Sequence, residues 1–105
     1  MLRSALFGLI LSALAAAPAI GQEIPCVATV ERAWSDAGLD RSDVDETFVT
    51  DRYHFDAENE YLIGYDIWTR FKSCKGALVV DITDSCYLRQ VYTRGECRLP
   101  GVPSF

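Results

Sequence analysis

A chain of 105 residues with fifteen Asp and Glu and ten Lys and Arg has room for one small folded domain. Behind an N-terminal leader, nine bases and fifteen acids remain, and this net charge of −6 argues against a general binder of nucleic acid or anionic membranes. All four cysteines follow the leader. An even number of cysteines in a short exported chain favours two disulfides over a metal site or a reactive thiol.

Residues 1–21 are predicted to form a signal peptide of the Sec type. Arg3 precedes an apolar run, and small residues then suit cleavage after Ala19 or after Gly21. The apolar run is shorter than the roughly 20 residues that a membrane-spanning helix needs. We therefore expect residues 22–105 to be a single soluble domain with no membrane span, located in the periplasm or outside the cell.

An amphipathic helix is predicted over residues 25–37. Its apolar residues recur at spacings of three and four, and one stripe carries Val27, Val30, Ala33, Trp34 and Ala37. Pro25 suits the first helical turn, where its missing N–H would be unpaired anyway, and Gly38 suits the left-handed residue that ends a helix. Residues 39–46 are acidic and aperiodic, which predicts a connector.

From residue 47 onward the pattern has period two and is rich in β-branched and aromatic residues, which is typical of strands. Four strands are predicted, over residues 48–55, 61–72, 77–82 and 86–93. A hairpin loop at residues 56–60 would place Phe55 opposite Tyr61, Tyr53 opposite Ile63 and Val49 opposite Ile67. A turn at residues 73–76 would pair Phe71 with Leu78, Thr69 with Val80 and Ile67 with Ile82. The three strands would then share one buried face.

The register of the fourth strand depends on its turn. A two-residue turn would point Arg89 into the core opposite Val80, whereas a three-residue loop places Leu88 there, turns Cys86 toward the helix and leaves Arg89 on the open face. We favour the second register because it avoids burying an unpaired cation. The predicted fold class is α+β, with one N-terminal helix packed on a four-stranded antiparallel β-meander and with the other face of the sheet open.

The predicted strands restrict the disulfide pairing. Cys74 and Cys86 flank the third strand, so they should lie on the order of 30 Å apart, and Cys86 and Cys97 flank the fourth strand in the same way. Because a disulfide needs Cα atoms within about 7 Å, the predicted pairs are Cys26 with Cys86 and Cys74 with Cys97. A zinc site is disfavoured, since no Cys-x-x-Cys spacing occurs and an exported chain meets an oxidising compartment.

The sequence predicts no enzyme, no cofactor and no metal. The one histidine, His54, is predicted near the end of a strand with Asp66 on the same face, and this pair could serve a small hydrolase. No serine or free cysteine obviously joins the pair, so we favour an exposed strand histidine. The acidic residues 40–46 lack the ligand order of an EF-hand loop. Asp81 and Asp84 flank a predicted turn and are interpreted as turn and edge residues.

The charge distribution suggests a contact surface. Residues 22–66 hold twelve acids and three bases, whereas residues 67–105 hold three acids and six bases. The predicted open face displays His54 and Val79 together with five residues of the types that dominate interfaces: Arg52, Trp68, Arg70, Tyr87 and Arg89. We therefore expect a non-catalytic binding module whose partner is an unidentified protein or envelope component, not nucleic acid.

Three alternatives to this reading stay open. The module could be a periplasmic enzyme inhibitor, a version supported by fold analogy alone. It could instead be an accessory subunit that offers its first predicted strand, residues 48–55, for strand addition. The loop-like tail, residues 99–105, could also fold over Trp68, which would make the open face a second small core.

Overall fold

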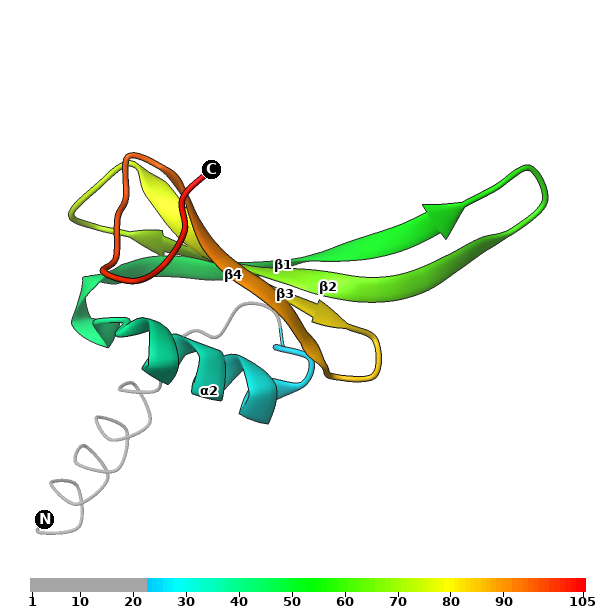
Figure 1. Ribbon diagram of the computed structural model, residues 1–105, viewed down its shortest axis with the longest axis horizontal. Helices are drawn as coiled ribbons and strands as arrows, with labels where there is room; N and C mark the ends of the chain where they lie inside the picture. The colour runs from blue at the N-terminus through cyan, green and yellow to red at the C-terminus, as the bar shows by residue number, and fades with distance from the viewer. Residues whose placement is uncertain (1–22) are drawn as a thin grey trace, which may run out of the picture.

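The computed structural model describes residues 23–105, so the predicted signal peptide and its cleavage sites lie outside the described residues. The elements in chain order are the helix α2 (Val27–Ala37), a short 3-10 helix (Arg41–Asp43) and the strands β1 (Val44–Phe55), β2 (Glu60–Phe71), β3 (Gly76–Thr83) and β4 (Leu88–Gly95). Within the described chain, the strands form one antiparallel sheet in the order β1-β2-β3-β4, and α2 packs on one face of it (Figure 1). The predicted α+β fold is confirmed.

The helix begins two residues later than predicted. Pro25 and Cys26 form a turn, because Cys26 has a left-handed backbone (φ 54°) that cannot continue an α-helix. Gly38 ends the helix with φ 75°, as predicted, and its N–H donates to the Ser35 carbonyl. The predicted stripe is buried at Val30, Ala33 and Trp34, whereas Val27 in the first turn is 51% exposed.

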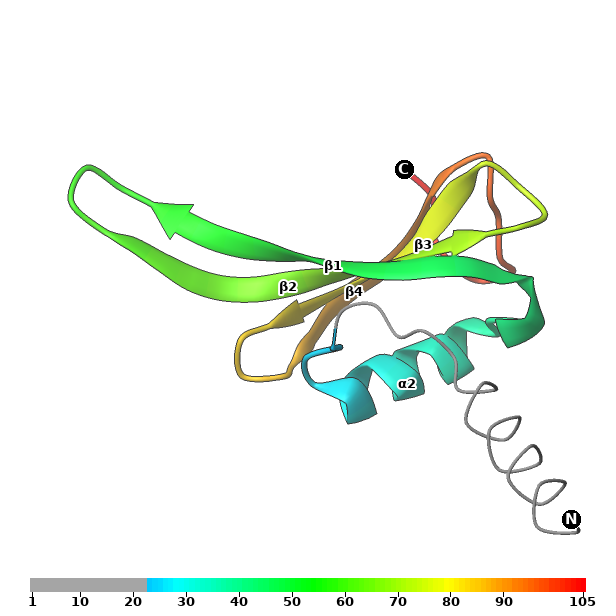
Figure 2. The same cartoon turned by 180° about the vertical axis from the view of Figure 1, so that it is seen from behind.

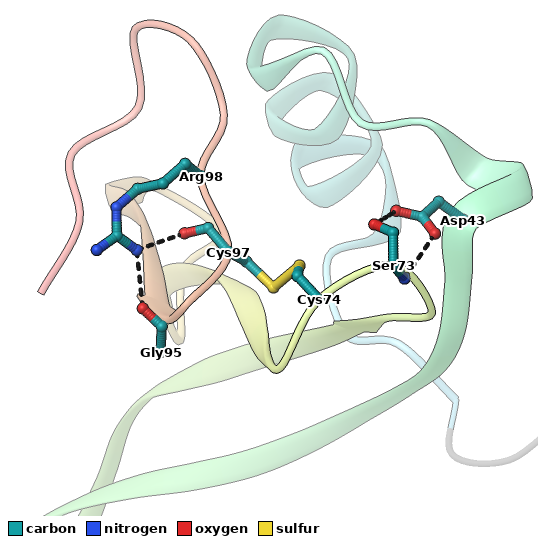
Figure 3. The surroundings of a disulfide bond; sticks show 6 residues. All are labelled: Asp43, Ser73, Cys74, Gly95, Cys97 and Arg98. Atoms are coloured by element: carbon teal, nitrogen blue, oxygen red, sulfur yellow. Dashed lines mark hydrogen bonds between the residues drawn. A yellow bond between two sulfur atoms is a disulfide. The ribbon is translucent and has the colours of Figure 1, made fainter.

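The predicted connector is ordered by its own acidic side chains, and β1 begins at Val44 rather than at residue 48. Asp40 caps the 3-10 helix by accepting a hydrogen bond from the Ser42 N–H, and the Ser42 hydroxyl, which also donates to it, lowers the pKa of this exposed carboxyl. Asp43 accepts hydrogen bonds from the backbone N–H and the hydroxyl of Ser73 (Figure 3). Asp43 therefore ties the start of β1 to the turn between β2 and β3.

The β1–β2 pairing follows the predicted register over most of its length. Val49 lies opposite Ile67, as predicted, but a register shift after Arg52 pairs Tyr53 with Leu62 instead of Ile63. The hairpin loop is consequently one residue shorter than predicted, with Phe55 opposite Glu60 rather than Tyr61. Figure 2 shows this hairpin extending well beyond the rest of the sheet.

The β2–β3 register differs from the prediction by two residues. Ile67 lies opposite Val80 and Thr69 opposite Leu78. Phe71 therefore lies beyond the paired stretch, which ends at Arg70 and Ala77. Because side chains alternate with period two, a shift of two residues leaves the same side chains on the buried face.

The β3–β4 register corrects a second prediction. Leu88 lies opposite Ile82 rather than Val80, and the strand begins at Leu88 rather than at residue 86. An irregularity leaves Arg89 as an extra residue, so Val91 lies opposite Val80. Arg89 nevertheless stays out of the core, as expected.

The core lies between α2 and the sheet. Its buried hydrophobic cluster consists of Val30, Ala33, Trp34, Ile67, Phe71, Leu78, Val80, Ile82 and Cys97. The C-terminal tail lies along the outer edge of β4, where Thr93 donates its N–H to the Pro103 carbonyl and accepts from the Phe105 N–H. The tail therefore covers part of the β4 edge.

Both predicted disulfides are confirmed. Cys26 pairs with Cys86, with Cα atoms 5.4 Å apart, and Cys74 pairs with Cys97, with Cα atoms 5.5 Å apart. The first joins the start of α2 to the β3–β4 loop. The second joins the β2–β3 turn to the segment after β4 (Figure 3). The four thiols are thereby committed to disulfides rather than to zinc.

We predict that replacing Cys26 and Cys86 by alanine lowers the free energy of unfolding by about 4 kcal/mol, and replacing Cys74 and Cys97 by about 3 kcal/mol, because the first pair closes the longer loop. Equilibrium denaturation under non-reducing conditions measures both losses. Cys26 and Cys86 have left-handed backbones, at φ 54° and 72°. Glycine at these two positions should therefore recover about 1 kcal/mol per position relative to alanine. Equal stability of the glycine and alanine variants would contradict this role of the backbone.

Candidate functional site

An apolar row crosses the face of the sheet that lies opposite α2. The registers of the three strand pairs place in this row Phe48, Trp68, Val79 and Tyr92. The Phe48 and Trp68 rings are stacked, with centroids 5.9 Å apart and an angle of 1° between their planes. At the other end of the row, the Phe105 ring of the tail meets the Tyr92 ring edge-on at 5.3 Å.

Two arginines lie over the stacked rings. The Arg70 guanidinium is 5.5 Å from the Phe48 ring centroid, and the Arg94 guanidinium is 5.9 Å from the Trp68 ring centroid. Both distances are within the range of cation–π attraction. Arg70 also forms an ion pair with Glu46 at 3.4 Å, so part of its charge is already neutralised.

These side chains border a surface hollow of about 590 Å³, which we call the Trp68 hollow. It is lined by Asp45, Phe48, Thr50, Trp68, Arg70, Phe71, Cys74, Lys75, Gly76, Ala77, Arg94 and Gly95. Gly76 in this lining permits the close approach of β4, because a Cβ there would lie only 2.1 Å from the Arg94 carbonyl oxygen. The Cys74–Cys97 disulfide fixes the wall of the hollow, because it joins the two segments that meet there (Figure 3).

The cations that line the Trp68 hollow differ in whether they have an ion-pair partner. Within residues 23–105, no carboxylate lies within ion-pair distance of Lys75 or Arg94, whereas Arg70 is paired with Glu46. Asp45 is the acidic side chain of the lining. The hollow therefore combines an aromatic wall with two cations whose charge is available to a ligand.

A separate cluster of ionic side chains lies one row further along the same face. The Asp81 carboxylate is 3% exposed and contacts the Arg52 guanidinium directly, and the Arg89 guanidinium lies 3.6 Å from it. Gln90 donates a hydrogen bond of 3.3 Å to the same carboxylate. Asp81 is thus a buried carboxylate within β3 that is paired with arginine, so its interpretation as a turn or edge residue is wrong.

Asp66 lies beside this cluster and is paired with Asp81 in the register. Burial raises the pKa of the Asp66 carboxyl, and the neighbouring Asp81 charge raises it further. Arg52, whose guanidinium is 3.9 Å from Asp66, opposes this increase, as does Arg89. Arg52 is therefore shared between two carboxylates, with its closer contact to Asp81.

The six predicted site residues are divided among four places. Trp68 and Arg70 border the Trp68 hollow, while Arg52 and Arg89 are engaged with Asp81. Tyr87 lies in the β3–β4 loop and is 73% exposed. The remaining residue is in the projecting hairpin.

That residue, His54, is not joined to Asp66. Its ring lies 5.0 Å from the Tyr61 ring, and its Nε2 is 3.8 Å from a carboxylate oxygen of Asp56. Asp66 instead lies beside Arg52. The arrangement therefore holds His54 among surface side chains of the hairpin.

The open-face prediction missed Phe48, Tyr92, Lys75 and Arg94. Alternation along β1 already placed Phe48 on the open face, since it shares its parity with Arg52, and this signal could have found it. Tyr92 and Arg94 depended on the irregularity in β4, which shifts the alternation by one residue. The tail contacts Tyr92 through Phe105, whereas the aromatic and cation–π contacts of Trp68 come from Phe48 and Arg94.

Residues 23–105 show neither a metal cluster nor a membrane-spanning helix. In this part of the chain, no group of three or more His, Cys, Asp and Glu side chains is arranged to hold a metal ion. Over the same residues, no helix has the length and apolar character needed to cross a membrane.

We predict that Arg52→Met lowers the free energy of unfolding by about 2 to 3 kcal/mol, because it removes the closest partner of a buried carboxylate. Arg89→Met is the matched control. The Arg89 side chain is 47% exposed and more distant from Asp81, so its loss should cost below about 1 kcal/mol. Urea denaturation of both variants measures the difference. A larger loss for Arg89→Met would contradict the assignment of Arg52 as the main partner.

We also predict that Asp66→Asn stabilises the protein at pH 7 relative to wild type, and that this advantage shrinks toward pH 3. The folded state raises the pKa of Asp66 above its ordinary value of 3.8, so ionisation of this carboxyl lowers stability as the pH rises through that window. Thermal unfolding of both proteins across this pH range measures the effect. Asp51→Asn, on the helix side of β1, controls for the loss of one carboxylate. A difference that does not vary with pH would contradict the prediction.

The chain was also compared with models of protein families, with curated proteins and with solved structures. None of the three comparisons finds a match. The interpretation of the Trp68 hollow therefore depends on the residues of this chain.

Proposed function

We propose that the protein is a non-catalytic binding module that holds a protein or envelope component in the Trp68 hollow. The observation that supports this most directly is the stack of Arg70, Phe48, Trp68 and Arg94 at the border of the hollow. Tryptophan and arginine are the residue types that contribute most binding energy at protein interfaces. Their side chains are held in place here by stacking and by the hydrogen bond from the Trp68 indole N–H to the Thr50 hydroxyl, 3.0 Å long.

The charges indicate what the hollow binds. Lys75 and Arg94 can each receive a carboxylate, since the described chain places none in ion-pair distance of them. The aromatic wall next to these cations suits an apolar or aromatic group beside that carboxylate. We infer that the ligand is an acidic protein segment that also carries an aromatic side chain.

The two disulfides indicate an oxidising compartment. We propose that this compartment is the periplasm or the extracellular space, reached through the predicted signal peptide. A module of this kind could block another protein as an inhibitor or connect components of an envelope assembly. The same hollow would serve both roles, because both require a pre-formed and rigid contact surface.

The open face supports binding better than hydrolysis. A hydrolase that used His54 would need a nucleophile and an orienting acid around the imidazole. The neighbours of His54 are the Tyr61 ring and the Asp56 carboxylate, on a hairpin that projects away from the Trp68 hollow. We therefore propose no catalytic role for His54.

We predict that Arg94→Gln and Trp68→Ala each weaken binding of a short Glu- and Tyr-containing peptide by about tenfold or more, because they remove a free cation and the aromatic wall. Titration calorimetry with the folded protein measures the affinity. Tyr87→Ala is the matched control, since it removes an exposed aromatic side chain from a different part of the molecule. A Lys- and Tyr-containing peptide controls for the sign of the charge.

If Trp68→Ala destabilises the sheet, the Arg94→Gln variant still tests the proposed function. Thermal unfolding of each variant shows whether its fold is intact. Unchanged peptide affinity in a folded Arg94→Gln variant would overturn the proposed function, and so would equal affinity for the acidic and the basic peptide.

A further inference from the structure

The β1–β2 hairpin projects from the body of the protein as a two-stranded arm, which we define as residues 53–62. Pairing between β2 and β3 ends at Gly64 and Thr83, whereas β1 and β2 stay paired as far as Phe55 and Glu60. Figures 1 and 2 show this arm extending away from the helix and from the other two strands. Among residues 23–105, the arm therefore has no third strand and no helix to cover its side chains.

The arm carries three aromatic side chains that are exposed to solvent. Phe55 is 68% exposed, Tyr61 is 53% exposed and Tyr53 is 41% exposed. The Tyr53 and Phe55 rings lie 6.2 Å apart, so they form a small apolar patch. We take this patch as the candidate contact site of the arm.

The acids at the tip of the arm differ in how they are engaged. Asp56 shapes the hairpin loop, because its carboxylate accepts hydrogen bonds from the N–H groups of Glu58 and Asn59. Glu58 and Glu60 are exposed, and no cation of residues 23–105 lies within ion-pair distance of either carboxylate. The tip thus presents two free negative charges beside exposed aromatic rings.

The arm and the Trp68 hollow are complementary in chemistry but lie at opposite ends of the molecule. The hollow combines an aromatic wall with the free cations Lys75 and Arg94, and the arm combines exposed aromatic rings with Glu58 and Glu60. The hollow lies at the β2–β3 turn, whereas the arm extends from the opposite end of these strands (Figure 1). One chain therefore cannot place its own arm in its own hollow.

We propose that the arm of one copy docks in the Trp68 hollow of a second copy, so that the protein associates head to tail. The proposal rests on the proposed function of the hollow and names a second copy of this chain as its partner. The two contacting surfaces are different, so the contact is heterologous, and in a pair one copy keeps a free arm and the other a free hollow. Such a contact produces a closed ring or an open chain of subunits.

The test uses two complementary variants of the exported chain. The arm variant, Glu58→Lys with Glu60→Lys, keeps an intact hollow, and the hollow variant, Lys75→Gln with Arg94→Gln, keeps an intact arm. Sedimentation velocity over a concentration series should show wild type associating, and each variant alone associating at least about tenfold more weakly. A mixture of the two variants should form a one-to-one complex and nothing larger, because one arm and one hollow remain functional.

Control variants with charge changes of the same sign and half the size lie on α2, where Asp36→Lys and Arg32→Gln alter exposed side chains away from both surfaces. Neither should change association. Raising the ionic strength from about 0.1 M to about 1 M shortens the screening length from about 10 Å to about 3 Å, so wild-type association should weaken.

Several outcomes would overturn the proposal. A wild-type protein that remains monomeric at every concentration would do so, as would a mixture of the two variants that forms no complex. Association retained in both variants would point instead to pairing through the edge of β1. Peptide binding separates this proposal from the proposed function. A monomeric protein that still binds the Glu- and Tyr-containing peptide would overturn self-association but leave the function of the hollow in place. A protein that neither associates nor binds the peptide would overturn both.

Discussion

In residues 23–105, a helix of eleven residues covers one face of the sheet, and the opposite face has no second layer of secondary structure. A sheet with both faces apolar would need such a layer. This chain instead covers the open face with long side chains that stack or pair with one another. Val79 is fully buried on that face, between Trp68 and Tyr92 in the same row. The aromatic and charged side chains of the open face therefore hold one another in place. They take the position that a second layer of secondary structure would occupy.

Because the core is small, this fold depends on its two disulfides for stability. A domain of this size gains limited stability from burial, and cross-links compensate by restricting the unfolded chain. Cys26–Cys86 anchors the first turn of α2, where Val27 is exposed and packing is weak. Cys74–Cys97 anchors the far end of the sheet and contributes Cys97 to the core. The same cross-link borders the Trp68 hollow, so it also keeps that surface rigid.

The sequence predicted those features that depend on periodicity, and it missed those that depend on single-residue irregularities. Both disulfide pairs could be derived because strand length alone separates the other combinations. The buried face of β2 and β3 survived a register error of two residues, since alternation has period two. The extra residue in β4 changed which side chains face outward, and no local sequence pattern predicts this irregularity. Tyr92 and Arg94 were missed for that reason.

The charge composition does not show which cations have an ion-pair partner in the fold. The C-terminal half of the chain carries an excess of basic residues, but the charge count treats Arg89 and Arg94 alike. The structure separates them, because Arg89 lies beside the buried Asp81 whereas Arg94 lies over the Trp68 ring with no ion-pair partner in the described chain. A buried carboxylate engages the first kind of cation and makes it part of the fold. The second kind keeps its charge available at the surface, and only this kind can select an acidic partner.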